Sequence, residues 1–153
     1  MRAENFYSIN INTIFALIME LHVTIDWCEK NYSASLATEG MGAVIATAKT
    51  EADVIKKFQE AFDFHIEGMK EDGDTIPAYI TNGDYKFVYE RTMSATLRNL
   101  QQYTTLSAIS KVTGIKHAQL SHYANGTSRP RAEQKNRILK GLHTIGQECL
   151  SAQ

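Results

Sequence analysis

Apolar and polar residues alternate with a period of two in short segments near the start of the chain. From Leu21 to Trp27 the sequence LHVTIDW places every second residue, beginning with Leu21, on one face. This period is typical of a half-buried strand. A polar turn at 29–31 leads into a second run, Tyr32–Ala37, so a hairpin is predicted. After a glycine-containing break, the run Ala43–Ala48 predicts a third strand.

The period changes to that of a helix after Thr50. Thr50 followed by Asp53 is the capping signature of a helix start, and the helix should run from about Glu51 to Glu71. Ile76–Pro77 should lead to an extended piece, and residues 84–90 predict one further strand. The order β-β-β-α-β describes a helix packed on one face of a small sheet, so an α+β fold is expected. The apolar stripe of the helix, spaced by three and four, is Val54, Ile55, Phe58, Phe62, Ile66 and Met69.

The second half of the chain is predicted to be helical throughout, because apolar residues recur at helical spacing between turn signals. The last of the predicted helices has more apolar positions than a domain this small requires, which suggests a contact between two copies. Packing on the first helix of this half explains most of those positions equally well. The predicted helices are Met93–Tyr103, 106–113, 116–124 and Ala132–Leu150, and the apolar face of the last is Ile138, Leu139, Leu142, Ile145 and Cys149.

The two short helices in the middle of this half have the spacing of a helix-turn-helix. The first ends at Gly114, which can adopt the positive φ of a tight helix stop. Ile115 should plug the turn, and Asn125–Gly126 should close the second helix. A unit of this kind places its second helix in the major groove of DNA. The residues expected to be buried in it are Leu106, Ile109, Val112, Ile115, Leu120 and Tyr123.

The turn Gly114–Ile115, together with Leu120–Ser121 and Asn125–Gly126, resembles the lambda-repressor-like (XRE) helix-turn-helix family. The resemblance implies that outward residues of the second helix reach base edges and that Asn125 touches phosphate. Gln119 is the best direct reader, since its amide can pair with adenine through two hydrogen bonds. A small helical bundle that does not bind DNA is the alternative. The expected DNA-contacting residues are Thr105, Lys116, His117, Gln119, Ser121, His122, Asn125, Arg129 and Arg131.

Charge divides the chain into two unlike halves, although the whole chain has a net charge of only −1. Residues 91–153 hold nine Lys and Arg against two acidic residues, a net charge of +7. Residues 1–90 hold seven Lys and Arg against fifteen acidic residues, a net charge of −8. The basic half suits phosphate contacts, whereas DNA would repel the acidic half. The asymmetry indicates two domains with different partners, with simple solubility as the alternative reason for the acidity.

The acidic half has a resemblance of its own, over about residues 19–80. The segment YSASLATEGMGAVIATAKTEADVIKKFQEAFDFHIEGMKEDGDTIP is similar to the HicB antitoxin family of bacterial toxin–antitoxin systems. The similarity lies in the hairpin, the short third strand, the Thr-capped helix and the ending Glu71-Asp72-Gly73-Asp74-Thr75-Ile76-Pro77. Some members of the family carry an XRE-type helix-turn-helix behind this domain. The turn after the second strand departs from the family because 38–42 lacks its usual proline.

The resemblance implies an antitoxin, with no cofactor and no catalytic activity of its own. Such proteins bind and silence a HicA-like ribonuclease toxin that cleaves messenger RNA, and the complex represses its own operon by binding operator double-stranded DNA as a homo-oligomer, a dimer or a tetramer. The fold implied is a partial ribonuclease H-like domain followed by an all-α helix-turn-helix domain. A nuclease would need several carboxylates around a metal ion. The strands offer only Asp26, with Glu20 and Glu29 at their ends, so nuclease activity is not expected. A plain transcriptional repressor, whose first domain oligomerises or senses a ligand, is the alternative function.

The remaining features concern boundaries and location. We expect residues 1–18 to be an extension that the core does not require, 19–82 a HicB-like domain, 83–91 a linker or last strand, and 92–150 the helix-turn-helix domain. Cys28 and Cys149 fit no zinc or redox spacing, which favours a reducing cytoplasm. The apolar run 14–19 is far shorter than the roughly 18 residues of a spanning helix.

Overall fold

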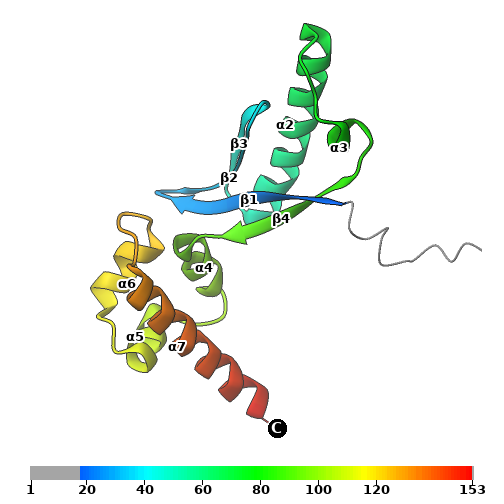
Figure 1. The fold of residues 1–153 in the computed structure, drawn as a ribbon. Helices are drawn as coiled ribbons and strands as arrows, with labels where there is room; N and C mark the ends of the chain where they lie inside the picture. Colours follow the sequence, from blue (N-terminus) through cyan, green and yellow to red (C-terminus); the bar gives the residue numbers. More distant parts are fainter. Residues whose placement is uncertain (1–17, 153) are drawn as a thin grey trace, which may run out of the picture.

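The computed structural model describes residues 18–152, and these form a mixed α+β fold. The described residues contain one four-stranded sheet and six helices. One long helix crosses a face of the sheet, and the last four helices gather at one end of it (Figure 1). No helix in this part of the chain is long and apolar enough to cross a membrane. The expected extension at 1–18 lies outside the described residues, except for Ile18.

The strands of the sheet are β1 (Met19–Cys28), β2 (Asn31–Thr38), β3 (Gly42–Ala48) and β4 (Tyr85–Arg91), in the order β3-β2-β1-β4. The first three strands pair antiparallel, as the predicted hairpin and third strand require. Strand β4 pairs parallel with β1 on the side opposite β2. The segment 83–91 therefore contains the last strand of the sheet. The two edges of the sheet are therefore β3 and β4.

Helix α2 (Glu51–Asp72) covers one face of the sheet. The Thr50 hydroxyl accepts a hydrogen bond from the Asp53 amide at the start of α2, and Gly73 ends it with φ 75°. The apolar stripe packs where the sequence predicts it, with Phe58 and Phe62 almost completely buried. Their rings meet Phe87 of β4 edge to face, at centroid distances of 5.5 and 5.0 Å. Aromatic pairs of this geometry add stability beyond the area that they bury.

One short element was not predicted. Helix α3 (Ala78–Thr81) occupies the segment expected to be extended. Pro77 stands before its first residue, and the Pro77 carbonyl accepts the first hydrogen bonds of the helix, from the amides of Ile80 and Thr81. Ile80 is buried in the core of the sheet. A single helical turn of this kind leaves too short a periodic pattern to be found from the sequence.

The last helices are α4 (Met93–Leu100), α5 (Leu106–Thr113), α6 (His117–Ala124) and α7 (Ala132–Ser151). Helix α4 is three residues shorter than predicted, since residues 101–103 form a turn. A separate hydrophobic core unites the four helices, with Leu97, Ile109, Leu120 and Ile138 fully buried.

Two expectations about this core are wrong. Val112 is 45 % exposed, and Cys149 is exposed as well. Gly141 is buried where α5 and α7 meet, and a Cβ there would come within 2.4 Å of the Thr113 side chain. The close approach of the two helices therefore depends on a residue without a side chain.

Candidate nucleic-acid interface

The turn between α5 and α6 is held by its own hydrogen bonds. Gly114 has φ 68°, which ends α5 as the sequence predicts. Ile115 is 3 % exposed and plugs the turn, and the Ser110 hydroxyl donates to the Ile115 carbonyl oxygen at 2.6 Å. The Arg137 guanidinium of α7 donates to the Thr113 carbonyl at 2.8 Å. The orientation of α6 relative to α5 and α7 is therefore fixed by both packing and polar contacts.

Helix α6 buries one side and presents the other to solvent. Leu120, Tyr123 and Ala124 face the core. The opposite side is exposed to solvent. Ala118 and His122 lie on this side and share one helix face, because they are four residues apart. Of the site residues expected on α6 and just before it, Lys116, His117, Gln119 and His122 are exposed, and Ser121 is partly buried.

Side-chain hydrogen bonds orient the polar groups of this face. The Gln119 amide donates to the Tyr123 hydroxyl at 2.6 Å, which leaves its amide oxygen and its second N–H for another partner. A ring nitrogen of His122 is 3.1 Å from the Thr127 hydroxyl. Both side chains are thus held in place without losing their outer hydrogen-bonding atoms.

The arginines after α6 lie beside the same face. Gln119, Arg129 and Arg131 line one surface hollow of about 390 Å³, together with Gln134 of α7. Gln134 was not predicted as a site residue, because nothing in its local sequence indicates that it faces this hollow. Thr105 stands at the start of α5, where its hydroxyl accepts from the Ala108 amide at 3.1 Å. Asn125 is exposed directly after α6.

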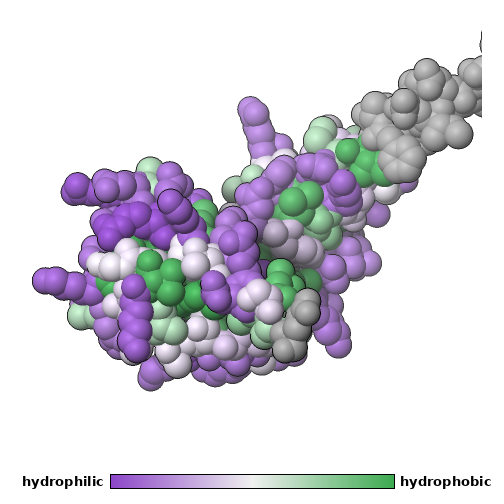
Figure 2. All heavy atoms as spheres, turned by 90° about the horizontal axis from the view of Figure 1, so that it is seen from below, coloured by the Kyte–Doolittle hydropathy of each residue, from purple (hydrophilic) through white to green (hydrophobic). Residues whose placement is uncertain are grey.

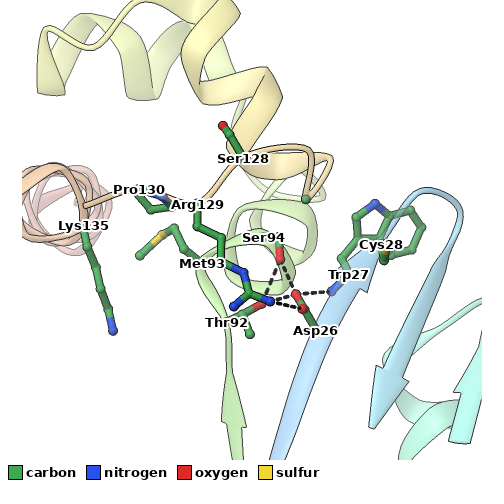
Figure 3. A pocket seen from close by; sticks show the side chains of 11 residues that line it. Asp26, Trp27, Cys28, Thr92, Met93, Ser94, Ser128, Arg129, Pro130 and Lys135 are labelled. Atoms are coloured by element: carbon green, nitrogen blue, oxygen red, sulfur yellow. Dashed lines mark hydrogen bonds and ion pairs between the residues drawn. The ribbon is translucent and has the colours of Figure 1, made fainter. Parts of the chain in front are cut away.

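A polar cluster joins the end of β1 to the start of α4, and Asp26 is at its centre (Figure 3). One carboxylate oxygen of Asp26 accepts hydrogen bonds from the Thr92 hydroxyl at 2.6 Å and from the Ser94 hydroxyl. It also accepts one from the Trp27 amide at 2.8 Å. The other oxygen lies 3.9 Å from the Arg129 guanidinium. Asp26 therefore connects the sheet both to α4 and to the loop that follows α6.

Contacts of Trp27 strengthen this junction. The Arg98 guanidinium of α4 lies 4.4 Å from the centroid of the Trp27 ring, within the range of a cation–π interaction. Gly126, in the loop after α6, approaches the Trp27 carbonyl so closely that a Cβ would come within 2.5 Å of its oxygen. The sheet is thus in direct contact with α4 and with the loop that follows α6.

The charge of Asp26 is stabilised by its neighbours. Partial burial raises the pKa of this carboxyl, but the hydrogen bonds from Ser94, Thr92 and the Trp27 amide, with the nearby Arg129 charge, outweigh that effect. The net result is a pKa below the usual value of 3.8. Because the pKa of Asp26 is lower in the folded protein than in the unfolded chain, the ionised carboxylate stabilises the fold fully at pH values above the unfolded pKa. This stabilisation is lost as the pH falls through the pKa of the folded protein.

Replacing Asp26 with alanine should lower the free energy of unfolding by about 2 kcal/mol at pH 7, because three donors lose their acceptor. Asp26→Asn keeps an acceptor oxygen and should cost less. Urea denaturation of the wild type and of both variants, at pH 7 and again near pH 3, measures this. The difference between wild type and Asp26→Ala should shrink at the lower pH. A difference that is equal at both pH values would contradict the proposed role of the charge.

Other candidate groups of the acidic half have their own contacts. Glu20 accepts from Lys86 of β4 at 2.8 Å, which lowers the pKa of Glu20. His22 contacts Glu90 at 2.8 Å. Within residues 18–152, no group of three or more His, Cys, Asp or Glu residues is placed to hold a metal ion. The three carboxylates considered for a nuclease are at separate places: Asp26 at the junction, Glu20 beside β4, and Glu29 in the turn between β1 and β2.

The candidate interface is the exposed face of α6 with Arg129 and Arg131 beside it, and it is suited to contact a groove or surface of a partner. No protein-family model, no curated protein and no solved structure matches this chain.

Proposed function

We propose that the protein is an antitoxin that also represses transcription. In this proposal α5 and α6 act as a helix-turn-helix that binds operator DNA. The acidic sheet and α2 bind and silence a small basic HicA-like ribonuclease. The observation that carries the proposal is the fixed orientation of α6, whose polar side is exposed beside Arg129 and Arg131.

The exposed side of α6 has the chemistry needed to read bases. A major groove about 12 Å wide admits one helix, and amide or imidazole groups on that helix can pair with base edges. Gln119 and His122 keep outer hydrogen-bonding atoms for this purpose. Lys116, Arg129 and Arg131 would lie close to the flanking phosphates and supply the part of affinity that is independent of sequence.

Operator binding by a helix-turn-helix generally uses two copies, and α7 offers a surface for a second copy. Val112 of α5 is 45 % exposed and Leu150 near the end of α7 is 85 % exposed, while Leu142 and Ile145 are only partly buried. Figure 2, seen from the side of the C-terminal end, shows hydrophobic side chains between hydrophilic ones on this part of the molecule. Helix-turn-helix dimers read half-sites about 34 Å apart, so a two-fold contact along α7 would have to place the two α6 helices at that separation.

The acidic half supports a protein partner of opposite charge. Its net charge of −8 would repel nucleic acid and attract a basic protein, increasing the rate of encounter. The resemblance of residues 19–80 to HicB antitoxins supports a ribonuclease toxin as that partner. Binding would cover the RNA-binding surface of the toxin.

DNA binding is tested by fluorescence anisotropy with duplexes tiled across the region upstream of the gene. We expect one duplex to bind at least about 1,000-fold more tightly than a random duplex of equal length. Its affinity should fall at least about 100-fold between roughly 50 and 200 mM salt, because several phosphates are neutralised. Equal affinity for all duplexes would exclude an operator in this region.

One observation favours a second candidate, a repressor controlled by a small ligand. A hollow of about 310 Å³ lies at the junction, lined by Asp26, Met93, Ser94 and Arg129 among others (Figure 3). A ligand there would contact both the sheet and the loop after α6. Operator affinity that changes with a cell extract freed of protein would favour this candidate over the antitoxin.

A further inference from the structure

A second surface on the acidic half, distant in the fold from the helices that follow β4, is formed where β3 and α2 meet. Two of the most exposed large apolar residues in the described chain belong to it, Ile45 of β3 at 65 % and Phe64 of α2 at 77 %. Both line a groove of about 400 Å³. Its remaining lining includes Ala61, His65 and Gly68 of α2, which share one helix face at spacings of four and three.

The groove runs beside an edge strand that carries no charge. Strand β3, with the sequence GAVIATA, is at the end of the sheet order, so within residues 18–152 its outer edge pairs with no strand. Exposed edge strands are usually protected by charged residues or proline, because their free N–H and C=O groups can pair with another chain. An edge strand that lacks such residues beside an apolar groove is the arrangement that accepts an added strand.

Charge decides which polypeptide the groove fits. Asp72 and Asp74 line it, and α2 as a whole holds seven acidic residues against three basic ones. A nucleic acid would be repelled, and a second copy of this chain would bring the same acidic residues together. We propose that β3 and α2 bind an extended segment of a basic protein. That segment pairs with the edge of β3, places an apolar side chain in the groove that Ile45 and Phe64 line, and directs Lys or Arg toward Asp72 and Asp74.

The inference rests on the proposed function only in the identity of its occupant, the basic toxin. The surface itself can be tested without that toxin. Full-length protein is used to select from a phage-displayed library of random 12-residue peptides. The best peptide is then synthesised with a fluorescent label, and its dissociation constant is measured by anisotropy. We expect the selected sequences to alternate apolar residues with Lys or Arg.

Gly68 allows the groove to be filled without harming the fold. A Cβ at Gly68 meets no atom within 4 Å, and leucine favours a helix more than glycine does. Gly68→Leu should weaken peptide binding at least about 10-fold, which corresponds to about 1.4 kcal/mol. Gly146→Leu on α7 is the matched control, since its Cβ also meets nothing within 4 Å, and it should bind the peptide as the wild type does. Phe64→Glu should weaken binding at least as much as Gly68→Leu.

Several results would overturn the inference. Selected peptides that are acidic or uncharged would exclude a basic partner, and unchanged binding by Gly68→Leu would exclude the groove. Sedimentation showing a dimer that Phe64→Glu dissociates would assign the groove to a second copy. Much tighter peptide binding after deletion of residues 2–17 would assign it to that segment of the chain. If the surface binds the peptide but no toxin is found, the proposed function fails while the surface stands.

Discussion

Replacing Gln119 and His122 together with alanine should weaken operator binding by about 100-fold or more, since each base contact contributes about 1–3 kcal/mol. The two side chains lie on the exposed side of α6, and neither contributes to the buried core. Stability, measured by urea denaturation, should therefore change little. Anisotropy with the operator duplex gives the affinity, and the affinity for random DNA should stay nearly constant because phosphate contacts remain.

The matched control uses the same residue types on another helix. His143 and Gln147 are exposed on α7, and their double alanine variant should bind operator DNA as the wild type does. The Gln119/His122 variant should also still neutralise the toxin. Loss of both activities would mean that the DNA-binding and toxin-binding surfaces are not separable, and full operator affinity would mean that α6 does not read the sequence.

Gly126→Ala should destabilise the protein by about 3 kcal/mol, more than most exposed substitutions. Gly126 has φ 72°, a conformation that L-residues rarely adopt, and the added methyl carbon would come within 2.5 Å of the Trp27 carbonyl oxygen. The Cβ is bonded to the backbone and the Trp27 oxygen is a backbone atom, so no side-chain rotation can separate the two. The clash can be removed only if the loop after α6 moves away from β1. The same movement would displace Arg129, and operator affinity should fall as well.

Gly146→Ala provides the comparison for this effect. Its Cβ would meet no atom within 4 Å, and it lies inside α7, so alanine should stabilise the helix by about 1 kcal/mol. Urea denaturation of the wild type and the two variants measures both effects. The free energy of unfolding should fall for Gly126→Ala and rise for Gly146→Ala. A Gly126→Ala protein as stable as the wild type would contradict the close contact between the loop and β1.

Local patterns were sufficient for most of the elements. Alternation between Leu21 and Trp27 predicts β1, and the pair Thr50 and Asp53 predicts the start of α2, because both signals depend only on residues near each other in the chain. The positive φ of Gly114 likewise follows from its position at a helix stop. Features of this kind are determined by backbone geometry before any tertiary contact forms.

Features that depend on distant residues could not be predicted. Asp26 is 66 residues from Thr92 and 68 from Ser94, and no periodicity indicates that they meet. The burial of Gly141 depends on the approach of α5, which the composition of α7 does not reveal. Val112 was expected inside because it follows Leu106 and Ile109 at a spacing of three, but it lies at the border of the contact between α5 and α7 and is 45 % exposed. The groove beside β3 was missed for the same reason, since it requires a strand and a helix to be placed together.

The proposal that this protein is an antitoxin is tested by purifying the tagged protein gently from its own host and determining the masses of the proteins that remain bound to it. We expect a small basic protein in fixed stoichiometry, encoded next to this gene, that is toxic when expressed alone and harmless when expressed with this chain. Operator DNA retained without any protein partner would contradict the claim. The protein would then be a repressor, and its acidic half would serve another purpose.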